Sequence, residues 1–407
     1  MTIQLTADQT LAYDAMVELL TTSQTELVIL GGAGTGKTTL VNTFLDEWST
    51  LVQLNPNQFK NYGFELTATT NKAADALASA TKKSTKTIHS LLGLRVVSRG
   101  YQDTHLVDNG TLPEYESVII IDESSFIDDE LLNLIRRKAK IAKAKIIYLG
   151  DHCQLKPVNA DTTPVFSAGI KTVELKQIVR QADTSPIQTL SRNLRALVDG
   201  APMPSAGVDG TNILHVPQDL FEELFKLECI KNPSVRALAW TNKRANYYND
   251  IAAMSLYGDK EFKPGNLLNL NKQLTSRGNW KLPTDTTIEV VATSPWFTDS
   301  NGIFCQTIQT THGIDLKYPA DYSQVVALIK AAYERSNPEQ AWVFENMYAD
   351  LRRMYASTVN KAQGSTYSTV FIDLTDIGKC RDKDQVNRML YVAASRAKDK
   401  IVFTGDL

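Results

Sequence analysis

The chain of 407 residues has little of several features that would assign it to a class at once. Its four cysteines, at positions 153, 229, 305 and 380, are scattered, and none stands at metal-ligand spacing from another cysteine or a histidine. We therefore expect neither a disulfide framework nor a zinc site, and free thiols fit a reducing, intracellular compartment. The N-terminus has no basic stretch followed by an apolar core, so we expect no secretory signal.

Hydropathy and net charge argue against two further classes of protein, membrane-spanning proteins and strongly basic nucleic-acid-binding proteins. No apolar run approaches the roughly 18 residues that a membrane span needs, so no membrane association is expected. The formal net charge is -2, so no overall basic field attracts nucleic acid, and a nucleic-acid partner would need a local groove. Hydrophobic residues at 43% and charged residues at 22% are ordinary for a globular protein, and this length predicts roughly two to four domains.

One stretch carries a specific chemical signal. Leu27–Leu30 is a short apolar run that predicts a buried strand, the run from Gly31 to Thr38 fits the pattern G-x-x-x-x-G-K-[ST], and Thr39–Leu45 predicts a helix. Glycines let backbone N–H groups converge on phosphate oxygens, and the helix N-terminus adds positive potential. The pattern predicts a nucleoside triphosphate site formed by Gly32, Ala33, Gly34, Thr35, Gly36, Lys37, Thr38 and Thr39. Lys37 is expected at the β- and γ-phosphates and Thr38 at Mg²⁺.

Two further predicted strands end in polar clusters. Val118–Ile121 runs into Asp122 and Glu123, which can serve Mg²⁺ and the attacking water, although a helix cap is the alternative. The strand at 146–149 is followed by Gln154, a candidate sensor of the γ-phosphate. Arg180 is a candidate for neutralising phosphate charge, the alternative being a surface arginine.

Other stretches leave two interpretations open. Gln9 precedes the phosphate loop and can pair with an adenine edge, or it can be an exposed residue at a helix start. Thr70 follows a predicted strand and can face a ligand or cap a helix, and His89 lies in a short polar turn where a lone histidine is commonly structural. Arg95–Gly110 predicts a small hairpin or a surface loop.

The second half repeats the strand-to-helix pattern with an interruption. Val235–Lys243 predicts a strand and a capped turn, residues 262–318 are rich in short β runs, and 321–354 predicts a helical hairpin. The end returns to α/β character, with a predicted helix over 386–397 that carries Arg396. If a second lobe packs on the first, Arg396 can complete the phosphate site as an arginine finger, which is worth about 10³–10⁵ in rate.

Taken together, these motifs resemble those of superfamily 1 helicases. Thr358–Thr366 resembles motif V, Tyr391–Ala397 motif VI, the stretch from Gly150 to Val158 motif III, and Ile121–Glu123 motif II. Size, the short insertion near 95–110 and the turn at 87–90 are most similar to the Dda/RecD-like branch. The resemblance implies an α/β fold with two RecA-like P-loop motor domains, a β-hairpin insertion, and a β-rich and helical, SH3-like accessory insertion.

The resemblance also assigns roles to residues. Lys37, Glu123, Gln154, Arg180 and Arg396 would be catalytic, Gln9 and Gly364 would join the phosphate loop in binding ATP, and Thr38 and Asp122 would hold Mg²⁺. The residues implied along the DNA are Thr70, Thr87, His89, Tyr101, Asn242, Thr358, Asn360 and Lys361, with Tyr101 stacking on a base at the hairpin.

The implied domains are 1–86 with 119–185, a pin at 87–118, 186–261 with 355–407, and an accessory insertion at 262–354. The implied function is an ATP-dependent DNA helicase that moves 5′ to 3′ on single-stranded DNA and opens junctions. It would act as a monomer alongside replication proteins, in the cytoplasm, which is that of a bacterial host if the chain is phage-encoded. An RNA helicase, or a nucleotide-switched nucleic-acid-binding ATPase that unwinds nothing, remains the alternative.

Overall fold

The computed structural model describes residues 4–54, 62–100, 103–108, 117–157, 162–177, 179, 185–205, 207–276 and 280–407. The chain divides into two compact units, which we treat separately. The first unit comprises Met1–Arg95, Asp108–Val216 and Val359–Leu407, and the second comprises Val96–Val107 and Pro217–Thr358. Over the described ranges, none of the helices has both the length and the apolar character that crossing a membrane requires.

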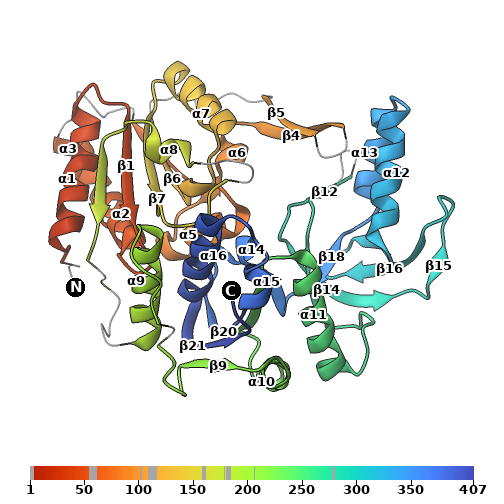
Figure 1. Ribbon diagram of the computed structural model, residues 1–407. Coiled ribbons are helices and arrows are strands. Elements are labelled where there is room, and N and C mark those ends of the chain that lie inside the picture. The colour runs from red at the N-terminus through yellow and green to blue at the C-terminus, as the bar shows by residue number, and fades with distance from the viewer. Residues whose placement is uncertain are drawn as a thin grey trace. The chain divides into compact units, whose positions relative to one another are not determined.

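A six-stranded sheet lies at the centre of the first unit, and each pair of neighbouring strands is parallel (Figure 1). The order is β3-β2-β6-β7-β1-β8, with bounds β1 Glu26–Gly31, β2 Gly63–Ala68, β3 Thr85–Thr87, β6 Ser117–Asp122, β7 Lys145–Gly150 and β8 Thr172–Leu175. Leu27–Ile29 and Val118–Ile121 are fully buried. Such apolar runs are typical of parallel sheets, because helices cover both faces. The α/β class predicted from the sequence is confirmed.

Helix α1 Ala7–Thr21 precedes the first strand. The helices between the strands are α2 Lys37–Asp46, α3 Trp48–Leu54, α5 Asn71–Thr81, α6 Ile88–Leu91, η1 Ser124–Phe126, α7 Asp129–Ile141 and α8 Pro164–Ser167. Met16 and Leu19 of α1 and Phe44 of α2 share one core with the sheet. Capping residues in the local sequence mark where three of these helices begin. The side chains of Thr6, Thr70 and Asp128 each accept a backbone N–H in the first turn of α1, α5 and α7. These crossovers bring the carboxyl ends of the strands to one edge of the sheet.

The rest of the first unit is a second parallel group, in which β21 Ala397–Thr404 lies between β20 Tyr367–Asp373 and β9 Ile213–Val216. The helices here are α9 Pro186–Val198, α14 Val359–Ala362, α15 Leu374–Ile377 and α16 Lys383–Ser395. Helices α9 and α16 lie side by side (Figure 1). The end of the chain therefore belongs to the same compact unit as the phosphate loop, which puts candidate residues from both ends of the sequence in one body.

The second unit combines α/β and antiparallel parts. Strands β10 Val235–Ala239 and β19 Ala356–Thr358 pair in parallel, beside α10 Gln218–Lys231 and α11 Asn242–Tyr257. An antiparallel sheet follows in the order β15-β16-β14-β11-β18, and β17 also pairs with β16. Its bounds are β11 Leu267–Leu270, β14 Thr287–Thr293, β15 Phe297–Thr298, β16 Phe304–Thr310, β17 Asp315–Pro319 and β18 Leu351–Arg353, with a small pair β12 Leu274–Thr275 and β13 Lys281–Leu282.

Two helices pack beside this sheet. Helix α12 spans Tyr322–Glu334 and α13 spans Pro338–Met347, with Asn337 as the N-cap of α13 and proline in its first turn. Val325, Ile329 and Phe344 share a core with Cys305 of β16. Strands β4 Leu94–Gly100 and β5 Asp103–Asp108 pair with each other, within the stretch where the sequence predicts a hairpin.

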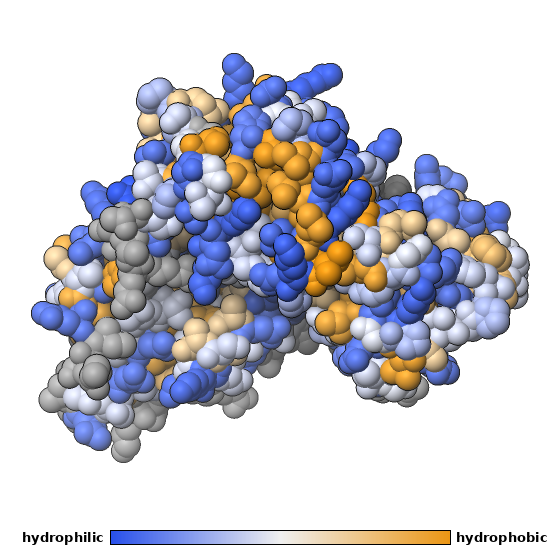
Figure 2. Space-filling model, turned by 90° about the horizontal axis from the view of Figure 1, so that it is seen from below, coloured by the Kyte–Doolittle hydropathy of each residue, from blue (hydrophilic) through white to orange (hydrophobic). Residues whose placement is uncertain are grey.

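Exposed apolar side chains gather on the second unit. Leu220, Leu227 and Ile230 of α10 and Tyr247 and Met254 of α11 are between 41% and 58% exposed. Figure 2 views the molecule from below and shows apolar side chains gathered toward the middle of that face. Large exposed side chains of this kind are individually ordinary on a protein surface, but here they are concentrated on two neighbouring helices.

Candidate functional site

The phosphate loop joins β1 to α2. Gly34 and Gly36 have φ angles of 83° and 80°, in the left-handed region that favours glycine, and a Cβ on Gly36 would collide with the Gln9 amide. Gly36 is also the N-cap of α2, which has no side-chain cap of its own. The first N–H groups of this helix are therefore open to an anion, as a phosphate-binding loop requires.

Lys37 folds back over the loop. Its ammonium donates to the carbonyl oxygens of Gly31 at 2.5 Å and Gly32 at 3.3 Å, and its charge partly opposes the rise that burial causes in the pKa of Asp122 and Glu123. It lies, half-buried, between the loop and these carboxylates. This is the position from which a lysine can reach the phosphates of a bound triphosphate.

Gln9 is fixed by contacts that the sequence analysis did not foresee. Its side-chain oxygen accepts from Thr6 N at 3.0 Å, which closes a capping box at the start of α1. Its amide nitrogen donates to the carbonyls of Thr35 at 3.1 Å and Gly36 at 3.4 Å, and the residue is buried. Gln9 therefore stabilises the phosphate loop through hydrogen bonds to two of its carbonyls. Its contact with adenine stays a prediction.

Two carboxylates stand at the carboxyl end of β6. Asp122 accepts from Glu123 N at 2.8 Å, and Glu123 has a φ of 52°, an uncommon conformation for a residue with a side chain. Burial raises the pKa of Asp122, against the opposing effect of Lys37. Burial and the Asp122 carboxylate raise the pKa of Glu123 to about 7, with Arg396 and Lys37 acting in the opposite direction.

This arrangement fits a cation and a base. Burial disfavours the ionised form of these two adjacent carboxyl groups, and a divalent cation between them would stabilise that form. Carboxylate oxygens are hard ligands of the kind that Mg²⁺ prefers. Thr38 and Asp122 would hold the ion, which when bound would neutralise phosphate oxygens. Glu123, with a pKa near neutrality, suits a general base acting on water.

Gln154 is held by a residue from motif V. It is buried, and its side-chain oxygen accepts from the amide of Gln363, which also donates to Ser125 Oγ at 3.2 Å. Ser125 lies two residues after Glu123, so Gln363 connects Gln154 to the segment that carries the candidate base. Gln363 was quoted only as part of a motif in the sequence analysis, and no property of an isolated glutamine would have singled it out.

Arg396 and Gly364 lie at the same site. Arg396 is 7% exposed, and its guanidinium donates to Ser395 Oγ at 2.8 Å and to Ser365 O at 3.3 Å. Its charge opposes the rise that burial and Asp122 cause in the pKa of Glu123. A Cβ on Gly364 would be 3.9 Å from Glu123 Oε1. The structure therefore brings Lys37, Asp122, Glu123, Gln154, Gly364 and Arg396 together in the first unit, as a phosphate-cleaving site needs.

Helix α16 contributes more than Arg396. Arg388 donates to the carbonyls of His152 at 2.5 Å and Gln154 at 2.8 Å, and its Nε donates to Asp384 at 2.8 Å. Tyr391 donates to Asp151 Oδ2 at 2.5 Å. Arg388 and Tyr391 are three residues apart and so share one helix face, a spacing that the sequence offered as a signal and that we did not use.

The candidate DNA-contacting residues are placed as follows. Thr70 and Thr87 cap α5 and α6, accepting from Ala73 N and Ser90 N at 3.2 Å in both cases. The register aligns Ala68 with both Asp122 and Thr87, so these two caps and the acidic pair lie at one sheet edge. His89 lies on α6, and burial lowers its pKa.

The remaining candidates are distributed over both units. Asn360 and Lys361 lie on α14 in the first unit, whereas Asn242 and Thr358 belong to the second. Asn242 Oδ1 accepts from Arg352 at 2.9 Å. Tyr101 and Arg180 lie outside the described residues, so their proposed roles stay predictions.

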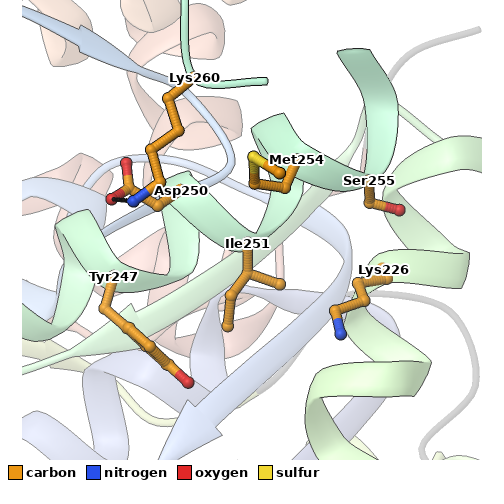
Figure 3. Close-up of a pocket in the computed structure, with 7 residues that line it drawn as sticks. All are labelled: Lys226, Tyr247, Asp250, Ile251, Met254, Ser255 and Lys260. Atoms are coloured by element: carbon orange, nitrogen blue, oxygen red, sulfur yellow. Dashed lines mark hydrogen bonds and ion pairs between the residues drawn. The ribbon is translucent and has the colours of Figure 1, made fainter. Parts of the chain in front are cut away.

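A separate pocket lies on the second unit (Figure 3). Its volume is about 470 Å³, and its lining residues come from α10, α11 and the loop that follows: Lys226, Tyr247, Asp250, Ile251, Met254, Ser255 and Lys260. Lys260 and Asp250 form an ion pair at 2.7 Å. None of these residues belongs to the nucleotide motifs, so the pocket is distinct from the phosphate loop.

Comparison with known families matches both ends of the chain. Residues 4–201 match a family described as "AAA domain", and residues 353–404 match the "UvrD-like helicase C-terminal domain". The "ATP-dependent DNA helicase dda" of Enterobacteria phage T4 is 22% identical, covering 98% of this chain and 99% of the relative. Over nearly its whole length the chain is similar to a helicase of the Dda/RecD-like branch of superfamily 1.

Other relatives agree with this assignment. The "ATP-dependent RecD2 DNA helicase" of Deinococcus radiodurans is 33% identical over 164 residues, which are 40% of this helicase and 20% of that protein. Among solved structures, one of Pif1 helicases at forked duplex DNA has a TM-score of 0.55 at 16% identity and covers 100% of this chain and 93% of that one. This likeness shows the shared fold. The predicted fold with two RecA-like domains is thus confirmed.

Proposed function

We propose that this superfamily 1 helicase is an ATP-dependent DNA helicase that translocates 5′ to 3′ on single-stranded DNA and unwinds duplex at junctions. The observation that carries the proposal is the convergence of Lys37, Glu123, Gln154 and Arg396 in one compact unit. The named relatives, a phage T4 DNA helicase and RecD2, support DNA as the polymer. The polarity rests on the similarity to the Dda/RecD-like branch.

The site supports hydrolysis rather than nucleotide binding alone. Glu123, whose pKa is about 7, would take a proton from the attacking water, while Gln154 would orient that water. Lys37 and Arg396 would stabilise the charge that develops on the transferred phosphoryl group. A protein that served only as a switch would need no base at this position, so the acidic pair favours an enzyme.

We further propose the domain roles that the sequence implies. The segments 1–86 with 119–185 and 186–261 with 355–407 would be the two motors, 87–118 the pin and 262–354 the accessory insertion. Thr70, Thr87, His89, Asn242, Thr358, Asn360 and Lys361 would contact the strand, with Tyr101 at the pin. The protein would act as a monomer, with replication proteins as its partners.

ATP hydrolysis in the presence of defined polymers tests the choice of function. We expect single-stranded DNA to raise kcat at least tenfold over the basal rate, and single-stranded RNA of the same sequence to raise it much less. Equal or greater stimulation by RNA would replace the proposal with an RNA helicase. Hydrolysis that no polymer stimulates would favour the nucleotide-switched protein instead.

A further inference from the structure

Tyr391 connects two parts of the nucleotide site that are remote in sequence. It is 2% exposed and lies on α16, and its hydroxyl donates to Asp151 Oδ2 at 2.5 Å. The same oxygen accepts from the backbone N–H of Ala33, in the phosphate loop, at 3.4 Å. A phenolic hydroxyl has one proton to donate and lone pairs to accept with, so both contacts can exist at once.

The carboxylate that orients this hydroxyl is itself fixed. Asp151 is fully buried, its Oδ1 accepts from Cys153 N at 3.1 Å, and the guanidinium Nε of Arg195 lies 3.5 Å away. Burial and the Asp151 charge hold the pKa of Tyr391 well above its ordinary value. The hydroxyl therefore stays protonated and keeps its proton for the bond to Asp151.

The loop packs closely on this tyrosine. A Cβ on Gly32 would be 3.3 Å from Tyr391 Oη and 3.2 Å from Arg195 Nε. These distances are tighter than most real side-chain contacts, so the loop backbone rests on both side chains with no room to spare. Gly32 is thus a position where the absence of a side chain permits the approach.

We infer that the Tyr391 hydroxyl is a positioning group for ATP hydrolysis, which fixes the phosphate loop relative to Arg396 on the same helix. This inference rests on the proposed function. Tyr391 bonds to Ala33 and Asp151, Arg388 bonds to the carbonyls of His152 and Gln154, and Arg396 lies at the end of α16. Helix α16 thereby sets the distances among the phosphate loop, the segment that carries Gln154, and Arg396, the candidate arginine finger.

The consequence is a specific kinetic signature. Tyr391 accepts from the Ala33 N–H, so ground-state binding of ATP would rest on the other N–H groups of the loop and on the Lys37 charge. The alignment of Arg396 with the loop matters in the transition state, and a misplacement of about 1 Å there can cost about 10² in rate. Loss of the hydroxyl should therefore lower kcat and change the KM for ATP little.

Tyr391→Phe in the full chain tests this inference by steady-state ATP hydrolysis with single-stranded DNA present. Tyr148→Phe is a matched control, because Tyr148 is also fully buried and its hydroxyl donates to a carboxylate, Glu26, at 2.9 Å. We expect Tyr391→Phe to lower kcat at least tenfold with KM within threefold, and Tyr148→Phe to keep both within threefold. If Tyr391→Phe does not fold, Asp151→Asn provides a second test, because it keeps the shape of the acceptor and removes the charge that orients the hydroxyl.

Three results would overturn the inference. They are a kcat within threefold of wild type, a rise in KM with kcat retained, and an equal loss of kcat in Tyr148→Phe, which would indicate general destabilisation. These outcomes are separable from failure of the proposed function, because the comparison needs only ATP hydrolysis. A wild-type protein that hydrolyses ATP without unwinding DNA would refute the helicase proposal and leave the Tyr391 test readable.

Discussion

Replacing Glu123 by glutamine separates catalysis from nucleotide binding and from stability. Glutamine keeps the size of the side chain and removes its negative charge and its capacity to accept a proton from water. A general base contributes typically about 10²–10⁴ in rate, so we expect kcat for ATP hydrolysis to fall at least 100-fold. Lys37 and the loop N–H groups remain, and one repulsive charge beside the triphosphate is gone, so the Kd for ATP should stay equal or fall.

The same substitution should stabilise the protein. Glu123 titrates near pH 7 in the folded state against an ordinary value of 4.5, a difference that corresponds to roughly 3 kcal/mol. Because the folded pKa is the higher one, ionisation opposes folding. The cost is absent below about pH 4.5, grows between pH 4.5 and 7, and is fully present above pH 7. Glu123→Gln should therefore be more stable by up to about 3 kcal/mol at pH 8 and by roughly 1 kcal/mol at pH 5.5.

Three measurements check this prediction. They are steady-state hydrolysis with single-stranded DNA, equilibrium binding of a fluorescent ATP analogue, and urea unfolding in EDTA without nucleotide at both pH values. Glu289→Gln is the control, since Glu289 is exposed on β14, far along the chain from the phosphate motifs, and should change none of the three. The unfolding experiments exclude Mg²⁺ because a bound cation would itself stabilise the ionised pair.

Each readout can refute a separate part of the reasoning. Glu123→Gln with more than a tenth of the wild-type kcat would remove Glu123 as the base. Loss of ATP binding would show that the side chain is structural. A variant less stable than wild type at pH 8 would show that Glu123 is not the electrostatically disfavoured group that its pKa indicates.

Three other predictions concern the motor and the hairpin. Lys37→Ala should abolish phosphate release, since its ammonium lies on the loop beside the carboxylates; full activity would refute the site. Arg396→Ala should lower kcat by about 10³ or more with ATP binding within tenfold, whereas an unchanged kcat would exclude an arginine finger. Replacing residues 98–105 by two glycines should remove the tip of the proposed pin. Translocation, measured as displacement of streptavidin from single-stranded DNA, should stay intact, and duplex unwinding should be abolished. Unwinding at the wild-type rate would contradict the pin.

The parts of the site that the sequence predicted are those whose chemistry is local. The phosphate loop needs glycine at left-handed positions, and Gly34 and Gly36 adopt them. The acidic pair follows a continuous apolar run, which identifies both the strand and its functional end. Thr70 is a helix cap, one of the two interpretations that its position after a predicted strand left open.

Sequence reasoning missed the residues that act through tertiary contacts. Tyr391 reaches Ala33 and Gln363 reaches Gln154 across more than 200 positions of the chain, and no local pattern encodes those pairs. Gln9 shows the converse case. Its capping-box spacing from Thr6 was readable, but its bonds to the loop carbonyls depend on how α1 packs beside α2.

Unwinding of two matched DNA duplexes, one with a 5′ and one with a 3′ single-stranded tail, tests the central claim most directly. In the presence of ATP and Mg²⁺ we expect strand separation of the 5′-tailed duplex and none of the 3′-tailed one. Separation only from the 3′ tail would contradict the polarity and would require the pin and accessory roles to be reassigned. Separation of neither duplex, by protein whose ATP hydrolysis single-stranded DNA stimulates, would contradict the account of this chain as a DNA helicase.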